Sequence, residues 1–378
     1  MPSTCMGSIA SAYYVLEPSN WTTTPNTIMG DVSAGYPTAV KYMSNNMFAI
    51  TVAVDPANSA AKRIWTCTDP RTDAWTGWTL PATFTKPIDI ERYGSYYIAV
   101  GESNTGAAVC YRSINGSSWS LNTVANCAKL LGVFNADGKV FIFGKNTSGT
   151  TSYWHSTSGI SWTQVTIGGG SYSNPIAFAM RTATQLCFIS DPGTGLLYFR
   201  LWNINTHADA GGSYISTYGG GTPSGVPIAA WGDTGNSRFQ VLTSLGYQYT
   251  SNPDAFTNQD WHQNAGITST VTAGNHQIPH PSHNVGMHRN GRNVIFGDNA
   301  TLRSRSTESW NGGFQLGNYI DASQTTTTAT LDSAVKWGGT YASTLGPNGT
   351  WLAIGFSDAT INASKKYNKL VYTDNPIW

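Results

Sequence analysis

The chain has 378 residues, a formal net charge of +1 and only 11% charged residues, against about 25% in ordinary soluble domains. This balance excludes the basic surface that attracts nucleic acid or an anionic membrane. No apolar run approaches the ~18 residues of a membrane span, and residues 1–6 lack the basic and apolar regions of a secretory signal. We therefore expect neither nucleic-acid binding nor membrane insertion.

The elements predicted in chain order repeat one pattern, namely strand, turn, strand, loop, strand and a closing hairpin that ends in an aromatic residue. The second copy is the clearest, with strands at 90–93, 96–101 and 108–113, followed by an Asn-Gly turn and Trp119. Asn-Gly supplies the positive φ that a tight hairpin needs. The Trp is large enough to hold a small sheet against its neighbour.

Seven such copies predict a closed all-β fold, because four-stranded units of about 40–50 residues are typical of a β-propeller. We expect one seven-bladed β-propeller domain over residues 1–378, made of four-stranded antiparallel blades. The last copy lacks a fourth strand, so a strand at 13–15 in the N-terminal arm (1–30) is expected to close the ring. The predicted blades cover residues 37–78, 88–119, 130–162, 175–211, 226–261, 284–310 and 332–378.

The closing hairpin of most copies keeps a frame with a hydroxyl residue first, Asn, Ser or Asp third and an aromatic residue seventh. We call this frame the box hairpin and expect it to be structural. Its predicted members are Ser113, Asn115, Trp119, Ser156, Trp162, Thr250, Asn252, Phe256, Ser304, Trp310, Asp374 and Trp378.

The box hairpin resembles the Asp-box (Ser-x-Asp-x-Gly-x-Thr-Trp) of sialidase-like propellers, shortened by one residue. It is more similar to the V-x-Y-G-N-G-x-F-V-A-V-G … S-x-D-G-x-x-W repeats of tailed-bacteriophage virion proteins, which residues 92–101 with Ser113 and Trp119 match best. The resemblance implies a propeller in a phage particle, although a propeller fold hosts many activities. Because Asn or Ser mostly replaces the Asp, we expect the boxes to bind no metal.

The sequence lacks the catalytic features that a sialidase resemblance would require. The Arg-Ile-Pro signature is absent, and residues 199–202 are a poor echo of it in the wrong copy. Glutamate occurs only at Glu17, Glu91, Glu102 and Glu308, and no two carboxylates stand out as a glycosidase pair. We expect no catalytic residues, no enzyme activity and no cofactor.

Binding is expected on the long polar loops of one rim, 211–227, 262–283 and 312–330, because rigid scaffolds usually carry their sites on such loops. Hydroxyl- and amide-rich loops with a few aromatics suit glycans or a flat protein partner. His276, His280 and His283 are also a candidate transition-metal site, but no carboxylate lies nearby and we expect a polar loop without metal. The candidate binding residues are Trp261, His262, His276, His280, His283 and Tyr319.

Two further patterns have a structural interpretation and an alternative. Five cysteines without CxxC spacing are expected to be small buried apolar residues, with Cys110 and Cys127 as the one pair to examine for a bridge. A slot in the first strand of each copy is mostly aromatic; it could stack on sugars, but we expect it to pack between blades. The slot holds Tyr42, Tyr93, Phe134, Met180, Trp231, His288 and Trp337.

Together these features predict a non-enzymatic virion protein of a tailed phage. It would be a tail hub, nozzle or fibre component, a receptor-binding protein or a head decoration. Its expected partners are other virion proteins in multiple symmetric copies, or a host surface glycan. The expected location is the virion, which is assembled in the host cytoplasm and exposed on the extracellular particle. A free carbohydrate-binding propeller lectin and a sialidase-like glycoside hydrolase are the alternatives.

Overall fold

The structure of the protein is a computed structural model. It describes residues 22–23, 35–54, 61–72, 74–168, 170–180, 182–191 and 198–214. Beyond these it describes the strand segments 227–233, 238–243, 248–251, 261–264, 286–289, 292–296, 301–306, 319–321, 337–345, 351–357 and 369–373.

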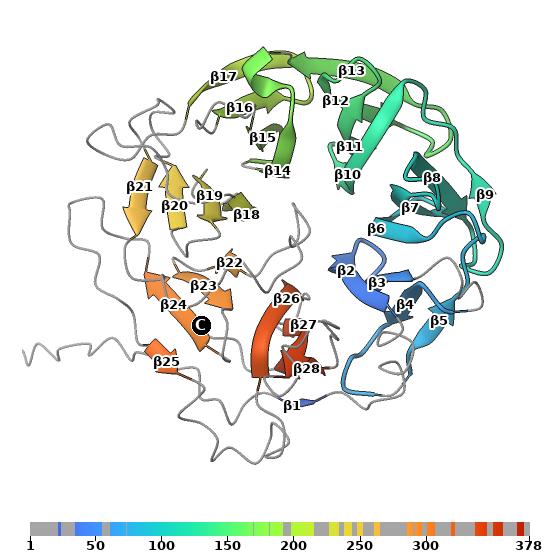
Figure 1. Ribbon diagram of the computed structural model, residues 1–378, viewed down its shortest axis with the longest axis vertical. Coiled ribbons are helices and arrows are strands. Elements are labelled where there is room, and N and C mark those ends of the chain that lie inside the picture. Colours follow the sequence, from blue (N-terminus) through green and yellow to red (C-terminus); the bar gives the residue numbers. More distant parts are fainter. Residues whose placement is uncertain are drawn as a thin grey trace, which may run out of the picture.

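Within these ranges the strands form seven antiparallel four-stranded sheets, which are arranged as blades around a ring (Figure 1). The predicted seven-bladed β-propeller is confirmed. The first four blades are β2 (Gly35–Met43), β3 (Met47–Val54), β4 (Ile64–Cys67) and β5 (Thr76–Trp78); β6 (Lys86–Tyr93), β7 (Tyr96–Glu102), β8 (Ala108–Ser113) and β9 (Ser120–Leu121); β10 (Cys127–Ala136), β11 (Lys139–Asn146), β12 (Thr151–Ser156) and β13 (Thr163–Gly168); and β14 (Pro175–Met180), β15 (Gln185–Ser190), β16 (Tyr198–Asn203) and β17 (Ala208–Tyr214).

The remaining blades follow the same order. Blade 5 has β18 (Pro227–Asp233), β19 (Arg238–Thr243), β20 (Gln248–Ser251) and β21 (Trp261–Asn264), and blade 6 has β22 (Gly286–Arg289), β23 (Arg292–Phe296), β24 (Thr301–Ser306) and β25 (Tyr319–Asp321). Blade 7 has β26 (Trp337–Leu345), β27 (Trp351–Ser357), β28 (Lys369–Thr373) and β1 (Thr22–Thr23). A short 3₁₀ helix, η3 (Gly170–Tyr172), precedes blade 4. The outer strands of blades 2 to 6 extend beyond the blade ranges expected from the sequence.

An N-terminal strand closes the ring, as predicted. β1 pairs antiparallel with β28, with Thr22 opposite Tyr372 and Thr23 opposite Val371. β26 in turn lies against β2, so the first and last blades are neighbours (Figure 1). The strand expected at 13–15 lies outside the described residues, and the strand that completes blade 7 comes later in the chain.

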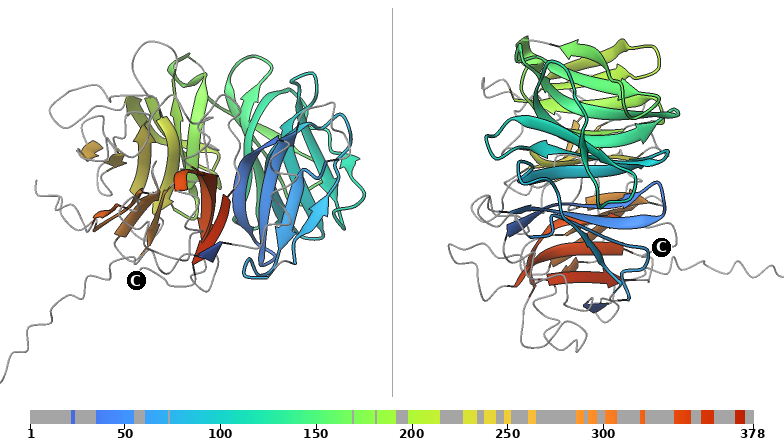
Figure 2. Two further views of the ribbon diagram at one scale, coloured as in Figure 1. Left: turned by 60° about the horizontal axis from the view of Figure 1, so that its bottom comes forward. Right: turned by 90° about the vertical axis from the view of Figure 1, so that its right-hand side faces the viewer.

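The second strands of blades 2 and 3 are buried on both faces, because a neighbouring blade covers each side (Figure 2). Ile98, Ala99 and Val100 of β7 are fully buried, as are residues 140–143 of β11. This burial explains their continuous apolar sequence, which differs from the alternation of a sheet with one wet face. Apolar clusters fill the joints between blades 1 and 2, 2 and 3, and 3 and 4.

A bulge recurs in the first strands, which are the innermost strands of the ring (Figure 1). In four blades the register against the second strand shifts directly after a proline, at Pro37, Pro87, Pro175 and Pro227. Proline has no N–H for the ladder and is tolerated at bulges and edges. The bulge leaves one residue unpaired, and in blade 1 that residue is Thr38, whose hydroxyl donates to the carbonyl of Pro87 in blade 2.

The last blade differs from the sequence expectation in its first strand. Trp337 opens β26 and pairs with Ser357, at the end far from the hairpin to β27. Tyr93, by contrast, lies beside its hairpin, opposite Tyr96. Trp337 therefore does not share the slot of the other first strands.

No helix in the described part of the chain has the length and hydrophobicity needed to cross a bilayer.

Candidate functional site

The box hairpin of blade 2 is a capped turn. The Ser113 hydroxyl accepts hydrogen bonds from the backbone N–H groups of Asn115 (3.3 Å) and Gly116 (2.9 Å). The Asn115 side-chain oxygen accepts hydrogen bonds from the backbone N–H groups of Ser117 (3.0 Å) and Ser118 (3.1 Å). The Trp119 indole N–H donates to the Gly116 carbonyl (2.9 Å). The short polar side chains thus satisfy backbone donors that the turn leaves unpaired.

Blade 3 repeats this arrangement. The Ser156 hydroxyl accepts from the N–H groups of Ser158 (3.1 Å) and Gly159 (2.8 Å). The Ser158 hydroxyl takes the place of the Asn115 oxygen and accepts from Ile160 (3.2 Å). In blades 2 and 3 the box residues thus cap their own turns, and the oxygens at the third position accept hydrogen bonds from backbone N–H groups.

The box hairpins of blades 2 and 3 also join their blades to the preceding ones. Trp119 packs on the apolar cluster between blades 1 and 2, with its ring centroid 6.1 Å from that of Trp78. Trp162 packs on the cluster between blades 2 and 3, and the Gly159 carbonyl accepts from the Asn122 amide of blade 2 (2.8 Å). The box is thus an inter-blade joint as well as a turn.

Gly116 has two reasons to be glycine. Its φ is +75°, and a Cβ built there would lie 2.3 Å from the Trp78 ring. Gly106 has a similar φ of +79° but nothing within 4 Å of a Cβ. We expect Gly106→Ala to cost about 1 kcal/mol through φ alone, and Gly116→Ala to cost at least about 2 kcal/mol more through overpacking. Urea unfolding of both variants measures the difference, and equal losses would show that the contact with Trp78 is unimportant.

Blade 4 carries a cap that the sequence frame does not reveal. Asn203 ends β16, and its side-chain oxygen accepts from the N–H groups of Asn205 (2.9 Å) and Thr206 (3.0 Å). These are the second and third residues after the cap, the same spacing as in blades 2 and 3. β17 begins at Ala208, so this turn is shorter and has no Trp at the seventh position. Asn at the end of a strand followed by polar residues was the available signal.

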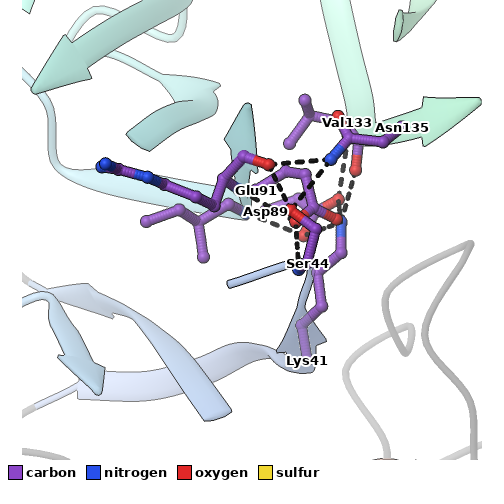
Figure 3. A network of polar contacts seen from close by, with 8 residues as sticks. Lys41, Ser44, Asp89, Glu91, Val133 and Asn135 are labelled. Atoms are coloured by element: carbon purple, nitrogen blue, oxygen red, sulfur yellow. Dashed lines mark hydrogen bonds and ion pairs between the residues drawn. The ribbon is translucent and has the colours of Figure 1, made fainter. Parts of the chain in front are cut away.

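Charged side chains of the first strands connect three consecutive blades at the centre of the ring (Figure 3). Lys41 of β2 places its Nζ 3.2 Å from Asp89 Oδ2 and 3.2 Å from Glu91 Oε2, both on β6. The same ammonium donates to the Val133 carbonyl of β10. The three charged residues are buried, with relative exposures of 8%, 0% and 6%.

This network caps the open edge of β10. The Val133 N–H donates to Asp89 Oδ2 (2.8 Å), and the Val133 carbonyl accepts from Lys41. Side chains from blades 1 and 2 thereby supply the partners that an adjacent strand would give an edge strand. Asp89 Oδ1 also accepts from the N–H of Ile90 (2.7 Å).

Glu91 and Asn135 extend the network toward the hairpin rim. Glu91 Oε1 accepts from the N–H groups of Ser44 (3.1 Å) and Arg92 (2.9 Å). The Arg92 carbonyl in turn accepts from the Ser44 hydroxyl (2.5 Å) and from the Asn135 amide (2.8 Å). Each of blades 1, 2 and 3 contributes a side chain, as Figure 3 shows.

The chemistry open to this network is limited by burial and pairing. Burial by itself lowers the pKa of Lys41, but Asp89 and Glu91 outweigh it, so the pKa lies above its ordinary value of 10.5. Lys41 is therefore an ammonium at neutral pH and cannot act as a base or nucleophile. The carboxylates of Asp89 and Glu91 accept hydrogen bonds from backbone N–H groups and form ion pairs with Lys41. The arrangement joins blades, and it presents no exposed acid–base pair.

The residues predicted to bind fall partly on strands and partly outside the described residues. Trp261 and His262 lie in β21, opposite Ser251 and Thr250, and Tyr319 lies in β25 opposite Arg303. These three positions are in outer strands, so their expected placement in loops is wrong. His276, His280 and His283 lie outside the described residues. No group of three or more His, Cys, Asp or Glu that could hold a metal occurs among the residues that are described.

The remaining box positions have mixed placements. Thr250 lies in β20, one residue before its end, and Ser304 lies inside β24, which continues through Ser306. Asn252, Phe256, Trp310, Asp374 and Trp378 lie outside the described residues. In the first-strand slot, Tyr93, Phe134 and Met180 pack against the clusters between blades, which confirms the packing role expected for them.

Cys110 and Cys127, the pair to examine for a bridge, are both free thiols and form no disulfide, and Cys67 is a free thiol as well. Cys67, Cys110 and Cys187 are buried, as predicted, and Cys127 is half-buried. Burial raises the pKa of Cys67 and of Cys127 to about 12. In a Cys5→Ser variant, we expect these thiols to react with a disulfide reagent at about pH 8 far more slowly than after unfolding. Rapid labelling of the native variant would contradict this burial.

Comparison with known proteins supports the fold and goes no further. No family model matches the chain, and no curated protein matches it. Among solved structures, the chain is similar to YCF48 from Cyanidioschyzon merolae, a β-propeller protein, with a TM-score of 0.59 and 9% sequence identity. The similarity covers 94% of this chain and 98% of that one. The chain is thus a β-propeller by sequence repeat, by topology and by structural similarity.

Proposed function

We propose that this chain is a non-enzymatic component of a tailed-phage particle, in which the propeller is a rigid platform that binds another virion protein or a host surface glycan. The observation that carries the proposal is that the charged side chains of the first strands, at the ring centre, are buried and paired with one another. Lys41, Asp89 and Glu91 are buried and paired within the protein. A sialidase-like enzyme needs such groups open to its substrate.

The assignment to a phage particle rests on the repeat. Residues 92–101, Ser113 and Trp119 match the repeat of tailed-phage virion proteins, and the capped turns of blades 2 and 3 give that repeat a structural reason. A neutral surface, with a net charge of +1, suits assembly against other proteins better than nucleic-acid packaging. Binding would then fall on the rim, where connections vary without disturbing the ring.

The test is location. Antibody raised against the purified chain is applied to gradient-purified particles of the phage that encodes it, and the labels are mapped by electron microscopy. We expect regular labelling at the tail or on the head, in symmetric copies. If the protein is found only in the soluble lysate and never on particles, the proposed virion role is wrong. The free lectin then becomes the better hypothesis.

A further inference from the structure

The closing turn of each of blades 2, 3 and 4 contains one residue with positive φ that lies against the preceding blade. In blade 2 it is Gly116, against Trp78, and in blade 3 it is Gly159, against Ile98. In blade 4 it is His207, with a φ of +54°. Two joints therefore use bare backbone at this position, whereas the third uses a titratable side chain.

His207 contacts blade 3 through its ring. Its imidazole stacks on that of His155 in β12, with centroids 4.8 Å apart and planes 20° apart. The His207 Nδ1 lies 2.5 Å from the hydroxyl oxygen of Tyr153. Tyr153 is fully buried in the cluster between blades 3 and 4, which also contains Trp202. The two histidines thus continue this apolar joint toward the surface, where both rings are partly exposed.

The charged groups around the stack are few. The positive charge of Lys139, at the start of β11, lowers the pKa of both histidines, and His207 lowers the pKa of His155 in the same way. Arg200 and Asp209 of blade 4 are bound to each other, with 2.5 Å between Nη2 and Oδ2. Within the described residues, the charges acting on the stack are therefore positive. Burial is the largest cause, followed by these charges, of a pKa below the ordinary value for both histidines.

We propose that the joint between blades 3 and 4 is a pH-sensitive contact, firm while His155 and His207 are neutral and weakened when both are protonated. Two imidazolium rings in this stack would repel each other and Lys139. Each lone pair of an imidazole lies in its ring plane, so stacked rings do not point at one common metal position. A switch on proton uptake is therefore the chemistry that this geometry offers.

The direction of the effect follows from the lowered pKa values. Well above the ordinary pKa of 6.5, the histidines are neutral in the folded and unfolded chain, and the joint has its full strength. As the pH falls through 6.5, the unfolded chain binds protons first, and the folded state loses stability. The loss is complete only below the folded-state pKa of both residues. The joints at Gly116 and Gly159 lack this dependence.

Histidine side-chain NMR titration of the full chain, combined with melting curves, tests the proposal. We expect His155 and His207 to titrate below 6.5, and the pKa of His155 to rise in His207→Asn, which removes the neighbouring charge while Asn tolerates positive φ. Between about pH 7.5 and about pH 5.5, the wild type should lose about 2–4 °C more in Tm than the double variant His155→Gln, His207→Asn.

Two results would overturn the proposal. One is titration of both histidines at or above 6.5 in the wild type, which would mean that the folded joint does not resist protonation. The other is an equal acid-induced fall in Tm for the wild type and the double variant. If the double variant fails to fold, the titration of the wild type alone decides, because it needs no substitution.

Discussion

Lys41→Met is expected to lower the free energy of unfolding by about 3–5 kcal/mol, as when one partner of a buried ion pair is removed. Met keeps most of the side-chain volume but leaves Asp89 and Glu91 buried without their cation, since both carboxylates lie 3.2 Å from Lys41 Nζ. It also removes the donor to the Val133 carbonyl. Urea unfolding of the wild type and the variant measures the loss.

A matched control separates this effect from a general loss of lysine charge. Lys86 forms an ion pair with Glu102 at 3.1 Å, but the two side chains are 36% and 27% exposed. Lys86→Met should therefore cost less than about 1 kcal/mol. Adding Asp89→Asn and Glu91→Gln to Lys41→Met should recover part of the loss, because the stranded charges are then gone. Equal losses for the two lysine variants would mean that the network does not hold the blades together.

Trp119→Ala is expected to lower the free energy of unfolding by about 3 kcal/mol, the lower end of the range for large-to-small changes at aromatic residues. The low end applies because Trp119 is half-buried, packed on the joint between blades 1 and 2. The substitution removes the contact with Trp78 and the bond to the Gly116 carbonyl (2.9 Å). The blade 1–2 joint loses apolar area, and the turn loses a donor.

Ile114 provides the control within the same hairpin. It is 63% exposed, so Ile114→Ala should change stability by no more than about 0.5 kcal/mol. Thermal melting of the two variants side by side reads out the difference. A Tm for Trp119→Ala as high as that of the wild type would show that the box Trp does not connect the blades.

The fold could be predicted from the sequence because its signals are local and repeated. Apolar runs such as 140–143 mark strands buried on both faces, and the Ser113–Asn115–Gly116 pattern marks a turn that requires a positive φ. Each signal is weak alone, but the same strands and turns recur in the same order in successive copies, and this repetition predicts the architecture. The missing fourth strand of the last copy likewise implied closure by the N-terminal arm, although β1 lies at Thr22–Thr23.

The central network could not be predicted, because its members are far apart in sequence. Lys41 and Asp89 are 48 residues apart, and Lys41 and Val133 are 92 residues apart. Only the curvature of the ring brings these first strands together. The two acidic residues within the strand 86–93 were a signal of a buried polar role, and the prolines that precede the register shifts were a signal of the bulges. Glu91 was considered only as a catalytic candidate, whereas its carboxylate binds the backbone N–H groups of Ser44 and Arg92 and the Lys41 ammonium.

The predicted binding residues show the opposite limit. Aromatic and polar residues near 261 and 319 suggested loops, yet Trp261 and Tyr319 lie in β21 and β25. These two outer strands are short, with four residues in β21 and three in β25, so their sequences carry little of the apolar pattern that marks β7 or β11. Composition alone therefore does not separate an outer strand from a loop.

The central functional claim is that the protein binds without catalysis, and one measurement tests it most directly. The purified full chain is incubated with surface polysaccharide from candidate host cells, and retention on the polysaccharide and the mass of the products are measured together. If the partner is a host glycan, the proposal predicts that the chain is retained on the polysaccharide and that the mass of the polysaccharide stays unchanged. If the partner is another virion protein, it predicts no retention and the same unchanged mass. Shortened polysaccharide, produced by the purified chain and absent from the buffer control, would contradict it.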